Sequence, residues 1–191
     1  MKSNMSDLTR KLKSVLAPLG RSEERHAVKV ALSKAQSLLQ EEHEPRSRIL
    51  GAELRIEKPP KRGRVPERLI SVFIVDYAHK RILDVVSKSF GKATTISVLT
   101  NFQPAFHPDE IKEAQSIAKS DSRVAKYAKM RGVVIGAAGP PMGEHMNHRV
   151  IGLHYLRTNK KGQNEPVAVV AVDLYDRQVV RIEKPDSEAR K

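Results

Sequence analysis

The chain has 191 residues, enough for one domain or two small ones, and 39% of them are hydrophobic, as in a folded protein. It contains no cysteine, which excludes disulfides, thiolate nucleophiles and cysteine-based zinc sites. The formal net charge of +13 favours polyanionic partners, although the basic excess is spread along the chain. No apolar run reaches the length of a membrane span or of a secretory signal, so we expect a cytoplasmic protein.

The first clear pattern is an amphipathic helix that follows a basic lead, residues 1–21, which forms either a short helix or a frayed leader. Apolar residues from Ala27 to Leu39 recur at three- and four-residue steps, and Ser22 is a suitable N-cap. The spacing therefore predicts a helix over residues 22–44. Four strand-like runs follow, at residues 49–58, 69–77, 81–89 and 93–101.

The same order of elements repeats in the second half. Pro108 suits a first helical position and is followed by two acidic residues, so we predict a helix over residues 108–131 with a kink at 120–122. Four further strands are predicted, at residues 133–137, 149–158, 167–174 and 178–183.

The two predicted helices also share the tripeptide Ala-Gln-Ser, at residues 35–37 and 114–116. A sheet with one apolar face must cover that face, and each preceding helix offers an apolar stripe of matching length. We therefore predict an α+β fold of two tandem units, each a helix packed on a mostly antiparallel four-stranded sheet. The expected limits of these units are residues 22–104 and 105–191.

Several of these stretches resemble the N-terminal region of copper amine oxidases. They are residues 72–77 with their return strand, 102–104, 108–111 leading to 120–124, and 169–174 followed by 179–183. In that family such patterns belong to two small cystatin-like domains that precede a large catalytic β-sandwich. The resemblance covers roughly residues 22–184, and it implies that both units have the cystatin-like fold.

The catalytic motifs of that family do not occur in this sequence. The family forms its quinone cofactor from a Tyr preceded by Asn, whereas Tyr77, Tyr127, Tyr155 and Tyr175 follow Asp, Lys, His and Leu. Its copper ligands include a His-x-His pair, and this sequence has none. We therefore expect no catalytic residue and no activity of its own; copper and quinone would enter only with a separate catalytic domain.

The resemblance implies a non-catalytic binding or assembly module. Exposed sheet edges would then recruit a protein partner or a second copy of the chain. An alternative that stays open is an accessory or truncated part of a primary-amine oxidase.

A second alternative is a polyanion-binding protein, which would contact nucleic acid or an anionic surface. The densest basic run comprises Lys58, Lys61, Arg62, Arg64 and Arg68. Prolines exclude residues 59–66 from a central strand, so an exposed loop is expected there. This run contains no aromatic residue and would contact phosphates rather than bases. A simple solvated loop is the other interpretation.

Three histidines form a candidate metal site: His145, His148 and His154. Imidazoles together with the nearby carboxylate of Glu144 could hold zinc or copper. His148 and His154 are an even number of positions apart, so their side chains face the same side of the sheet if the predicted strand extends back to His148. The alternative is that they are polar residues of the surface.

Overall fold

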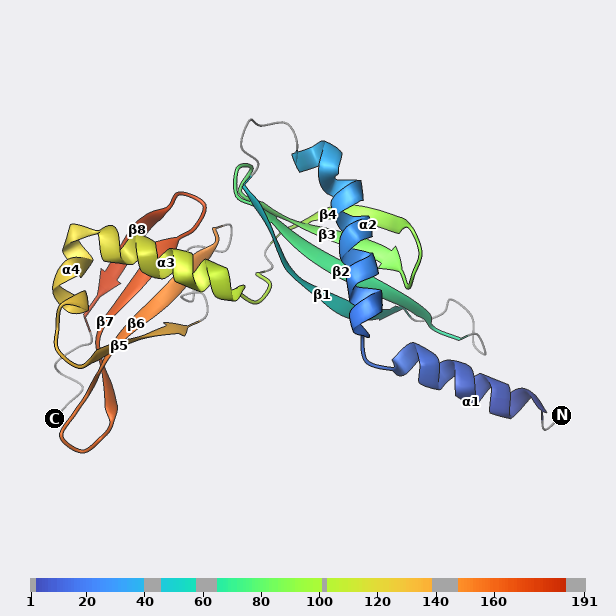
Figure 1. The fold of residues 1–191 in the computed structure, drawn as a ribbon, viewed down its shortest axis with the longest axis horizontal. Coiled ribbons are helices and arrows are strands. Elements are labelled where there is room, and N and C mark those ends of the chain that lie inside the picture. Colours follow the sequence, from blue (N-terminus) through green and yellow to red (C-terminus); the bar gives the residue numbers. More distant parts are fainter. Residues whose placement is uncertain (1–2, 40–45, 58–64, 101–102, 139–147, 185–191) are drawn as a thin grey trace. The chain divides into compact units, whose positions relative to one another are not determined.

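The computed structural model describes residues 3–39, 46–57, 65–100, 103–138 and 148–184 (Figure 1). The chain divides into two compact units, residues 1–100 and 101–191. Each unit has a four-stranded antiparallel sheet with its strands in chain order. The predicted α+β fold of two tandem helix-on-sheet units is therefore confirmed. None of the described helices is long and apolar enough to cross a membrane.

The first unit begins with two helices, and its elements are α1 (Ser3–Leu16), α2 (Arg21–Leu39), β1 (Ser47–Glu57), β2 (Glu67–Asp76), β3 (Arg81–Lys88) and β4 (Ala93–Leu99). The lead thus contains a helix, which ends before Pro18 as expected from the missing N–H of proline. Helix α2 starts one residue before the predicted helix, and residues 40–44 of that prediction lie outside the described part.

Helix α2 packs on its sheet through a stripe of small residues. Ala27, Ala31 and Ala35 recur every fourth residue, are at most 1% exposed, and allow close approach of the helix backbone to the sheet. They meet the inner face of β2 and β3, made of Ile70, Val72, Ile74, Leu83 and Val85. Burial of each such aliphatic side chain contributes roughly 1.5–3 kcal/mol before the entropy loss is counted.

The second unit comprises α3 (Pro108–Ser120), α4 (Ser122–Ala128), β5 (Val133–Ala138), β6 (Val150–Thr158), β7 (Asn164–Asp173) and β8 (Gln178–Glu183). The predicted kink is confirmed, because Asp121 separates the two helices. Its backbone N–H donates to the carbonyl of Ala118, and its side chain accepts the N–H of Arg123 at 2.8 Å. One residue therefore ends α3 and caps α4.

A buried arginine ties the second unit together. Arg149, just before β6, and Glu110, in the first turn of α3, are both 0% exposed. Nε and Nη2 of the arginine donate to the two carboxylate oxygens at 2.9 and 2.8 Å. The other donors reach Oε1 of Gln103 and the carbonyls of Pro104 and Ala105, at 3.1, 2.7 and 3.1 Å. All five guanidinium N–H groups are used, which meets the condition for burying this charge.

The first unit repeats this arrangement with different residues. Nε and Nη2 of Arg68, near the start of β2, donate to Glu23, in the first turn of α2, at 2.7 and 2.8 Å. Its other N–H groups donate to the carbonyls of Val15, Ala17 and Pro18, at 2.7, 2.6 and 3.2 Å. Hydrogen bonding to Arg68 lowers the pKa of Glu23 to about 2.

We refer to the Arg68–Glu23 and Arg149–Glu110 pairs, with their carbonyl acceptors, as the first and second clamps. Each clamp joins three pieces of its unit: the segment before the helix, the helix N-terminus and the start of the second strand. Taking the two clamps as equivalent gives a residue-by-residue correspondence between α2 and α3. Glu23, Ala27 and Ala31 then correspond to Glu110, Ala114 and Ala118. Gln103 and Pro104 therefore belong to the second unit, ahead of the boundary expected after residue 104.

Candidate functional site

Of the predicted basic patch, only Arg68 lies in the described part of the chain; Lys58, Lys61, Arg62 and Arg64 lie outside it. Arg68 is the centre of the first clamp, its side chain is 12% exposed, and all five of its donors have intramolecular acceptors. The guanidinium of Arg68 therefore uses all of its donors within the first unit, and none is left for a phosphate. A polyanion site at the other four residues stays a prediction.

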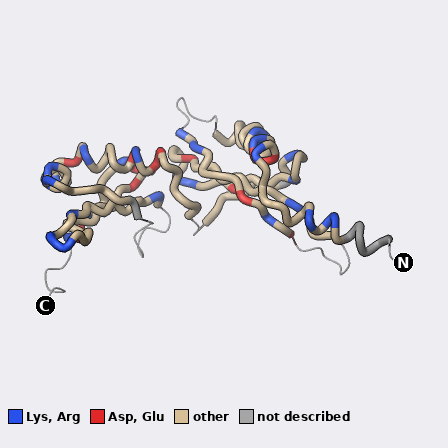
Figure 2. Tube along the Cα trace, turned by 60° about the horizontal axis from the view of Figure 1, so that its bottom comes forward, with Lys and Arg blue, Asp and Glu red and all other residues tan. Residues whose placement is uncertain are grey.

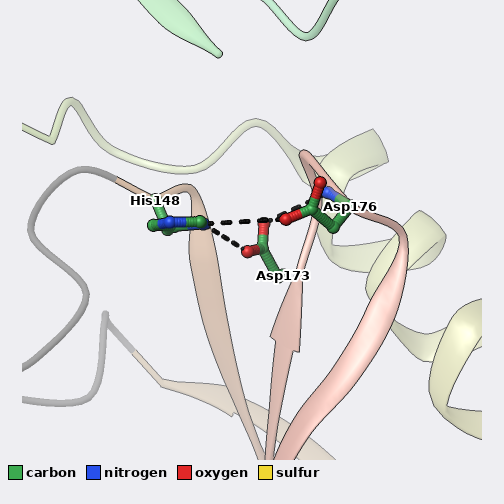
Figure 3. Close-up of side chains that lie close together, drawn as sticks. All are labelled: His148, Asp173 and Asp176. Atoms are coloured by element: carbon green, nitrogen blue, oxygen red, sulfur yellow. Dashed lines mark hydrogen bonds and ion pairs between the residues drawn. The ribbon is translucent and has the colours of Figure 1, made fainter.

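The histidine site takes a different form from the predicted one. His148 lies beside two aspartates, Asp173 and Asp176, at the end of the sheet where β7 turns into β8 (Figure 3). Its Nδ1 is 2.6 Å from Oδ2 of Asp173 and 4.0 Å from Oδ2 of Asp176. His145 lies outside the described residues, and His154, on β6 between Gly136 and Val169, is not a member of this group.

The second clamp positions this cluster. His148 immediately precedes Arg149, and its carbonyl accepts a hydrogen bond from Gln103 Nε2 at 2.8 Å. Asp173 is 2% exposed, and its Oδ1 accepts the N–H of Tyr175 at 2.8 Å, which shapes the turn. His148 is 39% exposed, so one edge of its ring faces solvent while Nδ1 is held by Asp173.

Two chemical roles fit this geometry. One is a structural role, in which Nδ1–H of His148 donates to the carboxylate of Asp173 and orients the ring. The other is a metal site: the imidazole and the two carboxylates could ligate a zinc-like ion if the 2.6 Å contact lengthened and the 4.0 Å contact shortened, both to about 3.3 Å, the ligand spacing around tetrahedral zinc. Sequence reasoning missed both aspartates, because they are brought to His148 only by the β6–β7 pairing. The signal was an Asp-x-x-Asp motif at a strand end.

A second surface of interest lies on α2, in the first unit. Arg21, Arg25 and Lys29 are exposed, lie away from the buried alanines of the helix, and form no ion pair with any described residue. Figure 2 marks the Lys and Arg positions along the Cα trace in blue. Beside this helix, the turn between β3 and β4 carries Phe90, which is 61% exposed. Its ring centroid is 5.7 Å from that of His26 on α2.

The outer face of the first sheet, opposite α2, contains a hollow of about 330 Å³. It is lined by Arg55, Glu57, Glu67, Leu69, Val86, Lys88 and Thr95. On the same face Asp84 is 7% exposed, burial raises its pKa, and its Oδ1 has no hydrogen-bond partner among the described residues. Arg55 Nη1 lies 3.8 Å from its other oxygen. The hollow thus has charges of both signs at its rim and no preformed group that selects one ligand.

The fold is similar to part of a solved copper-containing benzylamine oxidase from Hansenula polymorpha, with a TM-score of 0.50 and 11% sequence identity. The alignment covers 84% of this chain and 29% of the oxidase chain, so this protein spans less than a third of its length. The C-terminal domain of YpeB from Bacillus megaterium aligns at a TM-score of 0.26 and 12% identity, over 84% of this chain and 62% of that one. No protein-family model and no curated protein matches the sequence.

The likeness to the oxidase shows a shared fold at low sequence identity. It confirms the resemblance to copper amine oxidases at that level, while the assignment to their N-terminal domains stays a prediction. Fold and activity are separable, since one scaffold carries different functions by changes in its loops.

Proposed function

We propose that this protein is a non-catalytic binding or assembly module, related in fold to copper amine oxidases, whose partner adds to the edges of its sheets. The observation that supports this function is the character of the outermost strands. In the order of each sheet, β4 ends the first and β5 begins the second, so each has one neighbouring strand. Val98 on β4 is 52% exposed and Val134 on β5 is 65% exposed.

An outermost strand offers a row of backbone donors and acceptors to another chain, and apolar side chains on it favour that pairing. Natural proteins commonly protect such edges with lysine or proline. The described parts of β4 and β5 carry neither: β4 reads Ala-Thr-Thr-Ile-Ser-Val-Leu and β5 reads Val-Val-Ile-Gly-Ala-Ala. A protein segment in extended conformation, including a strand of a second copy, is the partner that this edge fits.

Sedimentation velocity over a wide concentration range tests the proposal on the chain alone. We expect self-association that Val98→Lys or Val134→Lys removes, because a lysine on the edge opposes strand pairing. Ser33→Lys is the matched control, since it adds the same charge at an exposed position of α2, away from the outermost strands. A monomer at every concentration, together with pull-downs from the host that the edge lysines leave unchanged, contradicts the proposal.

The oxidase-related alternative requires a catalytic domain from another chain. It is tested by searching the neighbouring reading frames for an Asn-Tyr-acid motif with a His-x-His pair, and by measuring amine oxidation after mixing the two purified chains. No oxidation by the mixture removes this alternative.

A further inference from the structure

The outward side of α2 carries a straight row of cations. Arg21, Arg25 and Lys29 are four residues apart, which places successive charges about 6 Å apart along one side of the helix. Because the opposite side is buried on the sheet, all three charges face solvent. The helix has two acids: Glu23 is buried and paired with Arg68, and Glu24 is exposed beside Arg25, so it offsets one of the three positive charges and leaves an excess of two.

An exposed aromatic ring lies next to this row, in a backbone conformation that aromatic residues rarely adopt. Phe90 has φ of 51°, at the third position of a turn closed by the bond from Gly91 N–H to Lys88 O at 2.9 Å. Gly or Asn ordinarily takes such a position, because a Cβ is unfavourable there. The ring of Phe90 is 61% exposed, so burial of the ring does not explain why an aromatic residue occupies this turn. Such outliers are concentrated at sites that bind something.

The turn that carries Phe90 is fixed to α2 on both sides. Ser89 Oγ donates to the carboxylate of Glu23 in the first clamp, and His26 Nε2 donates to the carbonyl of Gly91 at 3.3 Å. A Cβ at Gly91 would lie 2.9 Å from Cβ of Lys88, so the close turn needs glycine there. The ring is therefore held at a defined place beside His26, which is adjacent to Arg25 and one helical turn before Lys29.

A row of cations with an adjoining exposed ring matches one class of ligand. Guanidinium and ammonium groups bind phosphates along a backbone, and an exposed ring stacks on a base only where that base is unpaired. An anionic membrane fits less well, because an interfacial helix inserts its apolar side into the lipid, and the apolar side of α2 is buried in the protein.

We propose that α2 and the β3–β4 turn form a binding site for single-stranded nucleic acid. Arg21, Arg25 and Lys29 contact successive phosphates, and Phe90, backed by His26, stacks on a base. This site is separate from the sheet edges of the proposed function, so either can fail without the other.

Fluorescence anisotropy with a labelled oligouridylate of about 12 nucleotides tests the proposal on the full 191-residue chain. The double variant Arg25→Ala/Lys29→Ala should weaken binding about tenfold or more at low salt. It should also reduce the slope of log K against log salt by about 1.4, because each lost phosphate contact contributes about 0.7 for a single strand. Phe90→Asn keeps a residue suited to the turn, and should weaken binding roughly five- to hundredfold with the slope unchanged.

The matched control is Lys160→Ala/Lys161→Ala, which removes the same charge from the exposed β6–β7 turn of the other unit. It should leave the affinity within about twofold of the wild type. Thermal melts establish that each variant is folded.

Three results overturn the proposal: no binding at about 50 mM salt, equal losses in the control and the α2 variant, or a Phe90→Asn protein that binds as the wild type does. Binding to phosphatidylserine vesicles that the α2 variant loses, without oligouridylate binding, would assign the surface to membranes and equally overturn it.

Discussion

The same turn carries different chemistry in the two units. In each, the turn between the third and fourth strands contains one residue with positive φ, Phe90 at 51° and Arg177 at 53°. In each, the clamp lies beside it. The first unit presents an aromatic ring next to basic residues at this place, and the second presents Asp173 and Asp176 next to His148. The repeated clamp and helix preserve the scaffold, while the turns differ, and differences in function are expected there.

The clamps themselves differ in burial. The side chains of Arg149 and Glu110 are 0% exposed, whereas those of Arg68 and Glu23 are 12% and 9% exposed. Removal of one partner leaves the other charge more completely desolvated in the second unit than in the first. The two units should therefore respond unequally to the same substitution.

The largest effect is expected for Arg149→Ala. It leaves the carboxylate of Glu110 buried without its counter-ion and removes the donors to three acceptors in the segment before α3. We expect a loss of about 3–5 kcal/mol in the free energy of unfolding, measured by urea denaturation. Arg157→Ala, at an exposed position on β6, the strand that follows Arg149, is the control and should change stability by less than about 0.5 kcal/mol. Equal effects of the two substitutions would refute a stabilising role for this clamp.

Arg68→Ala should have a smaller effect, about 2–3 kcal/mol, because water reaches part of this pair. It should also loosen α1 from the unit, since the carbonyls of Val15 and Ala17 lose their donor. Limited proteolysis between α1 and α2 should become faster. An Arg68→Ala protein that is less stable than Arg149→Ala would reverse the ranking of the clamps.

The contribution of the first clamp to stability can be recognised by its dependence on pH. The pKa of Glu23 is lowered from 4.5 to about 2, so its ionised form stabilises the fold fully above pH 4.5, and this contribution is lost as the pH falls towards 2. We expect roughly 2–3 kcal/mol of acid-dependent stability from this carboxylate. Glu23→Gln should flatten the stability curve in that window, and Glu24→Gln, at the exposed neighbouring position, should not. A curve unchanged by Glu23→Gln would contradict the assignment.

The histidine cluster of the second unit tests the difference between the turns. We predict that calorimetric titration with zinc gives an isotherm that His148→Ala removes and His154→Ala leaves intact. The physical reason is that His148 lies with two carboxylates, whereas His154 is not in the cluster. A titration without heat means that the His148–Asp173 contact is an ion pair alone, and an isotherm that both variants abolish contradicts the assignment of zinc to this cluster.

Hydrophobic periodicity was sufficient to predict the helix-and-sheet order of both units. The apolar run in 69–77 and the apolar steps from Ala27 to Leu39 are local patterns, and the α3–α4 break was visible in the Ser-Asp-Ser triplet. The repeat itself was inferred in part from the wrong residues. The shared Ala-Gln-Ser tripeptides do not correspond, because the clamps align Ala27, not Ala35, with Ala114.

The clamps were not predictable from the sequence. Each joins residues about 40 positions apart, 45 between Glu23 and Arg68 and 39 between Glu110 and Arg149, and neither spacing has a local signature. The basic run therefore predicts a surface patch that includes Arg68, because nothing local distinguishes this arginine from its basic neighbours. Asp173 and Asp176 were missed for the same reason, as strand pairing alone brings them to His148.

The central feature of the structure is that each of the two units is held by its own clamp. Hydrogen exchange on the full chain, with Arg149→Ala compared with Arg68→Ala, tests this directly. We predict that Arg149→Ala reduces protection in β5–β8 and leaves β1–β4 as in the wild type, and that Arg68→Ala does the converse. Loss of protection in both sheets from either substitution, or in neither sheet from both, would contradict the account.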